Sequence, residues 1–346
     1  MMKNMNRITY LLIAVSLLFV SCDNTTSYKK DLQINNKNLE PQSLVVKSYN
    51  EALFSIDTHN FVNELKLIQK EYPAFLNGDL DDPEVIDYIR NFVTDTFCVR
   101  LNMMVEDRFS DKSSLDKEIK DVYQRFKYYY PDIQLAQPYY YISGVDYQTP
   151  PVVLTNDIVA ISLDYYLGTN DNMYDYLGMP RFRSARCHPS YITRDLAQSI
   201  YHYYVEKNHT QKDVLTEMIY MGKMNFFVEA MNPSLPDSVL LGYTAKQMSW
   251  VETYEGDIWA SIIGNNLLYA KGLDSYRNLF VDGPFTQAYS NEAPARLGEY
   301  IGLQIIRSYM THNDVTLQEL MNNNDIQQIF QYSQYKPRKK MMNYIS

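Results

Sequence analysis

Apolar side chains recur at helical spacing over most of this chain. Phe61, Leu65, Ile68 and Tyr72 lie three or four residues apart, and Pro73 ends the run. This spacing places apolar side chains on one face of a helix. The same pattern predicts helices over residues 83–97, 115–130, 191–205, 213–232, 244–254, 258–270, 297–309, 317–322 and 325–332.

A different pattern occupies the middle of the chain. Residues 139–142 and 158–163 are rich in β-branched and aromatic side chains, and Pro150-Pro151 separates them. We expect two or three strands of a small sheet here. Helices that flank one short sheet make an α+β fold, mostly helical.

A long segment after the predicted strands, residues 168–189, lacks either periodicity. It carries three arginines, Arg181, Arg183 and Arg186. Loops of this length without regular structure are often functional, so these arginines are candidates for the rim of a binding groove.

Glycine spacing marks one of the predicted helices. Gly298 and Gly302 are four residues apart, so both lie on one helix face. That face carries no side chain at either position, which predicts a closely approaching neighbour.

The first 22 residues form a secretory signal. Lys3 and Arg7 precede an almost unbroken apolar run over residues 8–20, and Ser21-Cys22 closes it. The run is shorter than the roughly 20 apolar residues of a resident membrane span. Phe19-Val20-Ser21-Cys22 resembles the bacterial lipobox, in which the cysteine becomes the lipidated first mature residue. We therefore expect an anchored protein of the cell envelope, at the outer membrane, with Cys22 as the lipidation site.

The domain organisation follows from these patterns. Residues 1–21 are the signal peptide, and residues 22–50, rich in polar side chains, are expected to form a flexible tether. Residues 51–337 are expected to form a single domain, followed by a basic tail over residues 338–346.

Composition excludes some functions and leaves others open. The 346-residue chain has a net charge of −9 and no dense basic stripe, which makes it a poor nucleic-acid binder. Besides Cys22 it contains Cys98 and Cys187, which could pair or remain free thiols. Its 32 tyrosines against 14 phenylalanines suit either sugar stacking or ordinary half-buried ring positions.

An ordered series of short motifs runs over residues 158–337. The segments are Ser162-Leu163-Asp164-Tyr165-Tyr166-Leu167-Gly168, Asp195-Leu196-Ala197, Met218-Ile219-Tyr220-Met221-Gly222-Lys223, Pro236-Asp237-Ser238, Gly242-Tyr243-Thr244, Ile258-Trp259, Leu267-Leu268-Tyr269, Gly283-Pro284-Phe285-Thr286 and Pro294-Ala295-Arg296-Leu297-Gly298, followed by Gly302 and Ile305-Ile306. This series resembles the gliding motility-associated lipoprotein GldB family.

The resemblance further implies a zincin-metallopeptidase-like domain with a degenerate HExxH helix. Arg194 and Gln198 stand where the two zinc-binding histidines would be, and Asp195 stands at the glutamate position. Met221 occupies the position of the third ligand. Zinc needs nitrogen, oxygen or thiolate ligands, so this motif predicts no metal and no cofactor.

Other chemistries leave no clear motif in the sequence. His202 and His209, if on one helix, are two turns apart and too far to share an ion. The sequence contains no GxSxG elbow and no glycine-rich phosphate loop.

These observations predict a lipid-anchored, non-catalytic envelope protein of the gliding motility or cell-surface machinery type. It would bind a protein or peptide partner in a zincin-like groove, with Arg181, Arg183, Arg186 and Arg296 at the groove or its rim. Two alternatives stay open: a metallopeptidase with a divergent site, and a glycan-binding surface lipoprotein.

Overall fold

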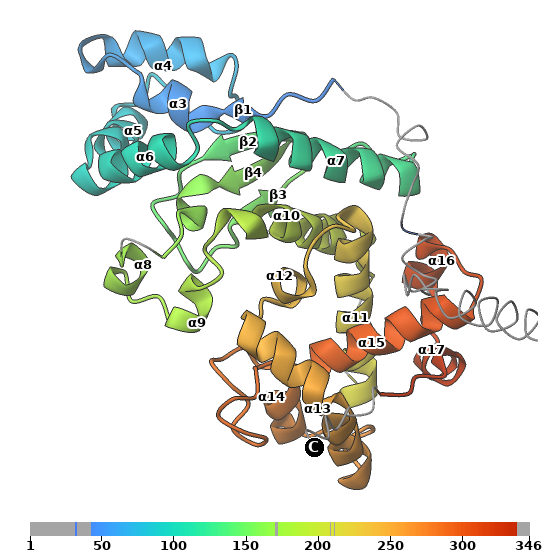
Figure 1. Ribbon diagram of the computed structural model, residues 1–346. Coiled ribbons are helices and arrows are strands. Elements are labelled where there is room, and N and C mark those ends of the chain that lie inside the picture. Colours follow the sequence, from blue (N-terminus) through green and yellow to red (C-terminus); the bar gives the residue numbers. More distant parts are fainter. Residues whose placement is uncertain (1–31, 33–42, 170–171, 208, 211, 338–346) are drawn as a thin grey trace, which may run out of the picture.

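A computed structural model describes residues 32, 43–169, 172–207, 209–210 and 212–337. Cys22, the signal peptide and the predicted basic tail lie outside these residues. Figure 1 shows a small sheet near the middle of the molecule, with helices above and below it. The predicted α+β, mostly helical architecture is confirmed.

The sheet has four strands in the order β1-β2-β4-β3. Strands β1, β2 and β4 are parallel neighbours, whereas β3 runs antiparallel to β4 and forms one edge. The strands span Lys47–Ser48 (β1), Gln137–Tyr141 (β2), Val152–Leu154 (β3) and Ile158–Ser162 (β4).

Helices α3 to α6 lie on one side of the sheet, at the upper left of Figure 1, and α7 crosses beside them. A small apolar cluster that includes Leu65 and Tyr139 holds α3, α4 and α5 against β2. The bounds are Tyr49–Phe54 (α3), Phe61–Gln69 (α4), Pro83–Thr94 (α5), Thr96–Arg108 (α6) and Ser113–Tyr129 (α7).

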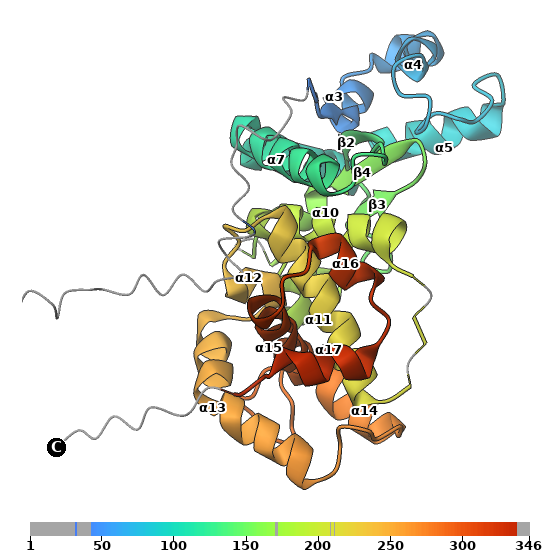
Figure 2. The same cartoon turned by 90° about the vertical axis from the view of Figure 1, so that its right-hand side faces the viewer.

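The C-terminal helices gather on the other side of the sheet, and α10 lies between them and the strands (Figure 2). They share the main hydrophobic core with α7, α10 and the sheet. The bounds are Met173–Tyr176 (α8), Arg181–Ser184 (α9), Ile192–Ile200 (α10), Val214–Met231 (α11), Asp237–Leu241 (α12), Ala245–Gly264 (α13), Leu273–Phe280 (α14), Leu297–His312 (α15), Leu317–Asn322 (α16) and Ile326–Ser333 (α17).

Helices α11 and α15 cross with their backbones in contact, as the glycine spacing predicted. A Cβ atom on Gly302 would lie 1.9 Å from the carbonyl oxygen of Met218, and one on Gly222 would lie 2.4 Å from the carbonyl oxygen of Gly302. A Cβ on Gly298 would lie 2.3 Å from the Phe280 ring. We call the crossing at Gly222 and Gly302 the α11–α15 seam.

A buried carboxylate ties the end of β2 to the end of β4. Asp164 accepts hydrogen bonds from the Ser162 hydroxyl at 2.6 Å and from the Val145 amide at 2.9 Å. Burial raises the pKa of this carboxyl, and the hydrogen bonds from Ser162, Ser143 and Val145 oppose that rise. Val145 has φ of 57°, a left-handed conformation that is unusual for a β-branched residue. The turn fixes the start of the segment that leads to β3.

The folded part of the chain begins earlier than the predicted boundary at residue 51. Strand β1 pairs with β2 through Lys47 and Ser48, and α3 begins at Tyr49. Leu32 is also buried, and its carbonyl accepts a hydrogen bond from Arg125 of α7 at 3.1 Å. The segment predicted as a tether therefore contains docked residues.

Several helix boundaries also differ from the prediction. The two helices expected over residues 244–254 and 258–270 are one helix, α13, which ends at Gly264. A single interior glycine, Gly256, costs a helix only about 1 kcal/mol and does not break it. Asp95 caps a separate helix, α6, by accepting from two backbone amides, and the sequence analysis missed this helix. The predicted loop over residues 168–189 contains the short helices α8 and α9.

The cysteines and the helix lengths settle two further points. Cys98 and Cys187 are buried free thiols, which decides between the two alternatives left open by the sequence. Within the described residues, no helix has both the length and the apolar character required to cross a bilayer.

Candidate functional site

A groove of about 860 Å³ lies between the edge strand β3 and helix α10. We call it the β3–α10 groove. Its walls come from the segment leading into β3, from α10 and the turn after it, and from the region around α9. The lining residues are Tyr147, Gln148, Thr149, Pro150, Pro151, Val152, Val153, Leu154, Tyr165, Tyr166, Met179, Arg183, Arg186, Cys187, Arg194, Asp195, Gln198, Ser199, His202 and Tyr203.

Helix α10 presents its polar side to this groove. Leu196 and Ile200 are completely buried in the main core, whereas Arg194, Asp195 and Gln198 line the groove. Helical periodicity therefore brings together three of the four positions predicted from the degenerate metal motif. The fourth, Met221, lies on α11, packs partly buried against the core and does not line the groove.

The carboxylate of Asp195 is held by two side chains. Its Oδ2 accepts a hydrogen bond from the Tyr166 hydroxyl at 2.8 Å, and its Oδ1 accepts one from Arg194 at 2.7 Å. Tyr166 is 1% exposed, and Arg194 also donates to the carbonyl of Leu240 at 3.1 Å. Asp195 thus joins α10 to the segment after β4, and Arg194 extends this connection to α12.

The four arginines predicted at the groove separate in the structure. Arg183 and Arg186 line it. Arg181 lies outside, is largely exposed and forms an ion pair with Asp175 at 3.2 Å. Arg296 is buried at the start of α15, so the prediction that it borders the groove is wrong. Its partner Glu299 is only three residues away, but nothing in the local sequence indicates that Arg296 is buried.

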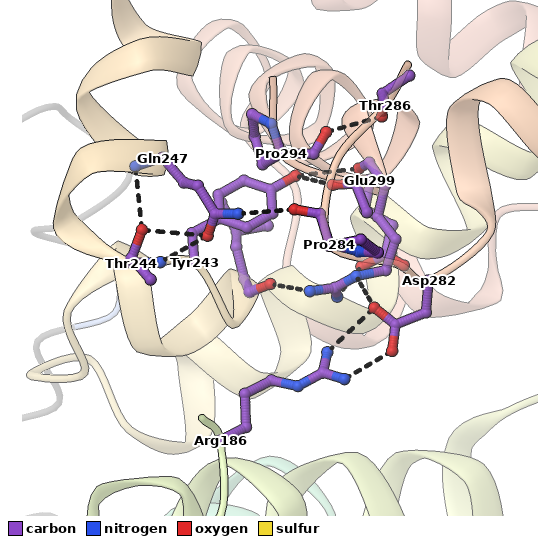
Figure 3. Close-up of polar contacts among 12 residues, drawn as sticks. Arg186, Tyr243, Thr244, Gln247, Asp282, Pro284, Thr286, Pro294 and Glu299 are labelled. Carbon is purple, nitrogen blue, oxygen red and sulfur yellow. Dashed lines mark hydrogen bonds and ion pairs between the residues drawn. The ribbon is translucent and has the colours of Figure 1, made fainter. Parts of the chain in front are cut away.

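Arg186 and Arg296 are nevertheless linked through one carboxylate (Figure 3). Asp282 lies 2.6 Å from Arg186 and 3.2 Å from Arg296, and Arg296 also pairs with Glu299 at 3.1 Å. Burial alone would raise the pKa of Asp282, but the two arginines hold it below its ordinary value. This ionic chain ties the groove rim to helix α15.

Gly242 leaves space for this series of ion pairs. Gly242 has φ of 67°, and a Cβ there would lie 2.8 Å from Cδ of Arg186 and 3.1 Å from Nη2 of Arg296. Next to it, the Tyr243 hydroxyl donates to the carbonyl of Ala295 at 2.9 Å. The Gly-Tyr-Thr segment singled out in the sequence therefore positions the two arginines (Figure 3).

Two nucleophilic side chains at the groove, Cys187 and Ser199, have no base as a hydrogen-bond partner. Burial raises the pKa of the Cys187 thiol to about 12, so the thiolate is scarce at neutral pH. The neighbouring His188 does not line the groove, and its Nδ1 lies 3.0 Å from the Ser190 hydroxyl. Ser199 donates its hydroxyl to the carbonyl of Val152 at 2.9 Å.

The two histidines considered as metal ligands lie on different segments and do not share one helix. A π-helical turn, Tyr201–Val205, carries His202 and ends before His209. His202 lies 2.6 Å from Glu206, and His209 lies 2.8 Å from Glu217. Across the described ranges, no group of three or more His, Cys, Asp and Glu side chains is arranged to hold a metal ion.

Sequence analysis missed one entire wall of the groove. Residues 147–154 carry no catalytic pattern, and only Pro150-Pro151 marked this stretch as unusual. Asp282, the partner of two arginines, was also missed, because it is 96 residues from Arg186. Contacts over such separations leave no local signal.

Comparison with known proteins gives one match. No curated protein and no solved structure matches the chain at a significant level. A family model described as gliding motility protein GldB matches residues 29–337, which include both the α11–α15 seam and every residue of the groove. The chain therefore belongs to the GldB family of gliding motility proteins.

Proposed function

We propose that this protein is a lipid-anchored, non-catalytic component of the gliding motility or allied cell-surface machinery. Its β3–α10 groove binds a protein or peptide partner. Membership of the gliding motility protein GldB family and the lipobox-like segment ending at Cys22 support the anchor and the setting. The groove supplies a binding volume within the range of ligand sites in proteins.

The pairing of Asp195 is the observation that carries the non-catalytic part. A general base must be within reach of a proton on substrate or water. Asp195 instead accepts from Tyr166 at 2.8 Å and from Arg194 at 2.7 Å. Arg194, at a position where a zincin has a ligand, neutralises the acid rather than holding a metal. We therefore interpret the site as a zincin-like groove with a vacated metal centre.

Zinc content tests this interpretation directly. The purified mature protein should carry no stoichiometric zinc after dialysis, as measured by elemental analysis. About one zinc per chain, lost on Gln198→Ala, would instead support the divergent metallopeptidase. The matched control is Gln247→Ala, whose side chain lies on α13 and donates to the carbonyl of Pro284.

Restoration of the motif tests the zincin-like arrangement. Arg194→His with Gln198→His should give weak zinc binding, because the third ligand is absent. Adding Met221→Glu should raise the zinc affinity in titration calorimetry only if α10 and α11 face each other as in zincins. Met221 lies outside the groove lining, so a glutamate there must reach the site from α11. Equal affinities of the two variants would remove the zincin-like part of the proposal while leaving the groove.

Partner binding is tested in a gliding bacterium that lacks its own family member. Complementation should need Cys22, and Cys22→Ala should abolish labelling by a fatty-acid analogue. Gln198→Trp, which fills the groove, should abolish spreading, whereas Tyr88→Trp at a position 76% exposed on α5 should not. Equal spreading of both tryptophan variants would contradict a function of the groove.

A further inference from the structure

Strand β3 presents unpaired backbone groups to the groove. It is the edge strand, and its register pairs Val153 with Ala160 of β4. On either side of that pair, the Thr155 N–H donates to the carbonyl of Ile158 and the Ser162 N–H donates to the carbonyl of Pro151, both at 2.9 Å. Hydrogen-bonded and non-hydrogen-bonded residue pairs alternate along an antiparallel ladder. Val153 therefore bonds to β4, whereas the N–H and C=O groups of Val152 and Leu154 point away from β4.

Most of these outward N–H and C=O groups are available for hydrogen bonds with a ligand. The carbonyl of Val152 accepts the Ser199 hydroxyl at 2.9 Å. Within the described part of the chain, neither the N–H of Val152 nor the N–H or C=O of Leu154 forms a hydrogen bond with backbone groups of loops, turns or helices. Both residues line the β3–α10 groove. An edge strand with such groups is a template for pairing with another chain.

The charge of the groove favours an acidic occupant. Its lining contains Arg183, Arg186 and Arg194 against a single carboxylate, Asp195, although the whole chain has a net charge of −9. Arg194 is paired with Asp195, and Arg186 with Asp282. Among the described residues, the exposed guanidinium of Arg183 has no ion-pair partner. It is therefore the cation left for a ligand.

The rest of the lining suits an extended peptide. Apolar surface comes from Pro150, Val153 and Met179, and the rings of Tyr147 and Tyr203 are 39% and 41% exposed. Recognition by strand addition combines main-chain hydrogen bonds with pockets for alternate side chains. The groove offers both next to one free arginine.

We propose that an extended polypeptide segment bearing an acidic side chain adds to the edge of β3. Its backbone pairs with Val152 and Leu154, and its carboxylate binds the Arg183 guanidinium. This inference rests on the proposed function and names the chemistry of the partner that the groove accepts.

Selection from a random library tests this proposal and does not require an identified partner. A phage-displayed library of random heptapeptides is selected on the purified mature protein, and enriched peptides are synthesised with a fluorescent label. We expect enrichment of peptides that contain aspartate or glutamate. Replacing that acid by lysine should weaken binding about tenfold or more, because charge-assisted hydrogen bonds are strong.

Two pairs of variants separate the contacts. Leu154→Pro removes an outward N–H while sparing the β4 ladder, and it should weaken binding about tenfold, whereas Leu154→Ala should weaken it less than about threefold. Arg183→Gln should weaken binding of acidic peptides about tenfold, whereas Arg181→Gln, outside the groove, should not. Peptides methylated at alternate backbone nitrogens repeat the first comparison without changing the protein.

Each contrary outcome overturns a stated part of the proposal. Equal binding of methylated and unmethylated peptides, or no enrichment over selection on the Leu154→Pro variant, overturns strand addition. Enrichment without acidic residues overturns the role of Arg183. If Gln198→Trp abolishes spreading while the library yields no acidic extended peptide, the proposed function stands and this inference alone falls.

Discussion

The α11–α15 seam and the β3–α10 groove differ in how closely their elements pack, although an arginine–aspartate pair lies at or near each. Where α15 continues past the seam, Arg307 pairs with Asp237 of α12 through two bonds of 2.7 Å, and at the groove Arg194 pairs with Asp195 at 2.7 Å. Near the seam the two helices leave no space for even one methyl group. At the groove the pair borders a volume of about 860 Å³.

The difference separates two roles for the motifs that mark the family resemblance. The segment containing Met218 and Gly222, and the pair Gly298 and Gly302, serve close helix packing. Asp237 forms a partly buried ion pair with Arg307, which also bonds Glu229 at 2.9 Å. The segments around Tyr166 and Asp195, by contrast, line the groove. In this chain the motif residues on α11 and α15 thus serve packing rather than the groove.

The largest expected effect is at the seam. Gly302→Ala should prevent folding or cost more than about 4 kcal/mol, because its Cβ would lie 1.9 Å from a backbone oxygen. Gly264→Ala, where a Cβ meets nothing within 4 Å, should change the free energy of unfolding by less than about 1 kcal/mol. Urea denaturation followed by circular dichroism measures both, and similar costs would show that the seam can relax.

Removing the cation of a buried ion pair should lower the free energy of unfolding almost as much. Arg307→Met leaves the carboxylates of Glu229 and Asp237 without this cation and should cost about 3 kcal/mol. Lys246→Met, which breaks an exposed pair with Glu292, should cost less than about 1 kcal/mol. Thermal unfolding of the two variants checks the contrast, and comparable losses would argue against burial as its cause.

At the groove, Asp195→Ala should cost about 2 kcal/mol, since the buried Tyr166 hydroxyl loses its acceptor. A position near a helix start would by itself suggest bonds to backbone amides and a smaller effect, but Asp195 bonds side chains instead. In a Tyr166→Phe background the same change should cost less. A double-mutant cycle by urea denaturation measures this coupling, and strict additivity would show that the hydrogen bond contributes nothing.

The smallest expected effect on stability depends on pH and comes from Lys223 of α11. Burial lowers the pKa of Lys223 to about 8, and its amine donates to the carbonyl of Asn323. Between pH 8 and about 10 the unfolded chain binds more protons at this lysine, so stability should rise with pH. Relative to Lys223→Met, the wild type should gain about 1–2 kcal/mol over this range. Parallel pH profiles of the two urea midpoints would contradict the shifted pKa.

Features that repeat locally could be predicted from the sequence. The glycine face of α15 follows from a four-residue spacing, and the grouping of Arg194, Asp195 and Gln198 follows from helical periodicity. The strands β2 and β4 follow from β-branched and aromatic composition.

Features made by distant segments were not predictable in this way. Strand β1 has only two residues, and it forms because β2 offers a parallel neighbour 92 positions further on. The pairing of Arg296 with Asp282 depends on how α14 leads into α15, so a residue predicted at the groove became part of the interior. The wall over residues 147–154 is set by the Asp164 turn, which joins segments about twenty residues apart.

The burial of Leu32 limits the reach of the membrane anchor. Its contact with Arg125 fixes this residue against α7, so only ten residue steps, from Cys22 to Leu32, separate the predicted lipid from the folded body. A chain of that length spans at most about 33–36 Å. With the acyl chains in a bilayer, Leu32 must stay within about that distance of the membrane surface. The short connection therefore keeps the part of α7 that contacts Leu32 near the membrane.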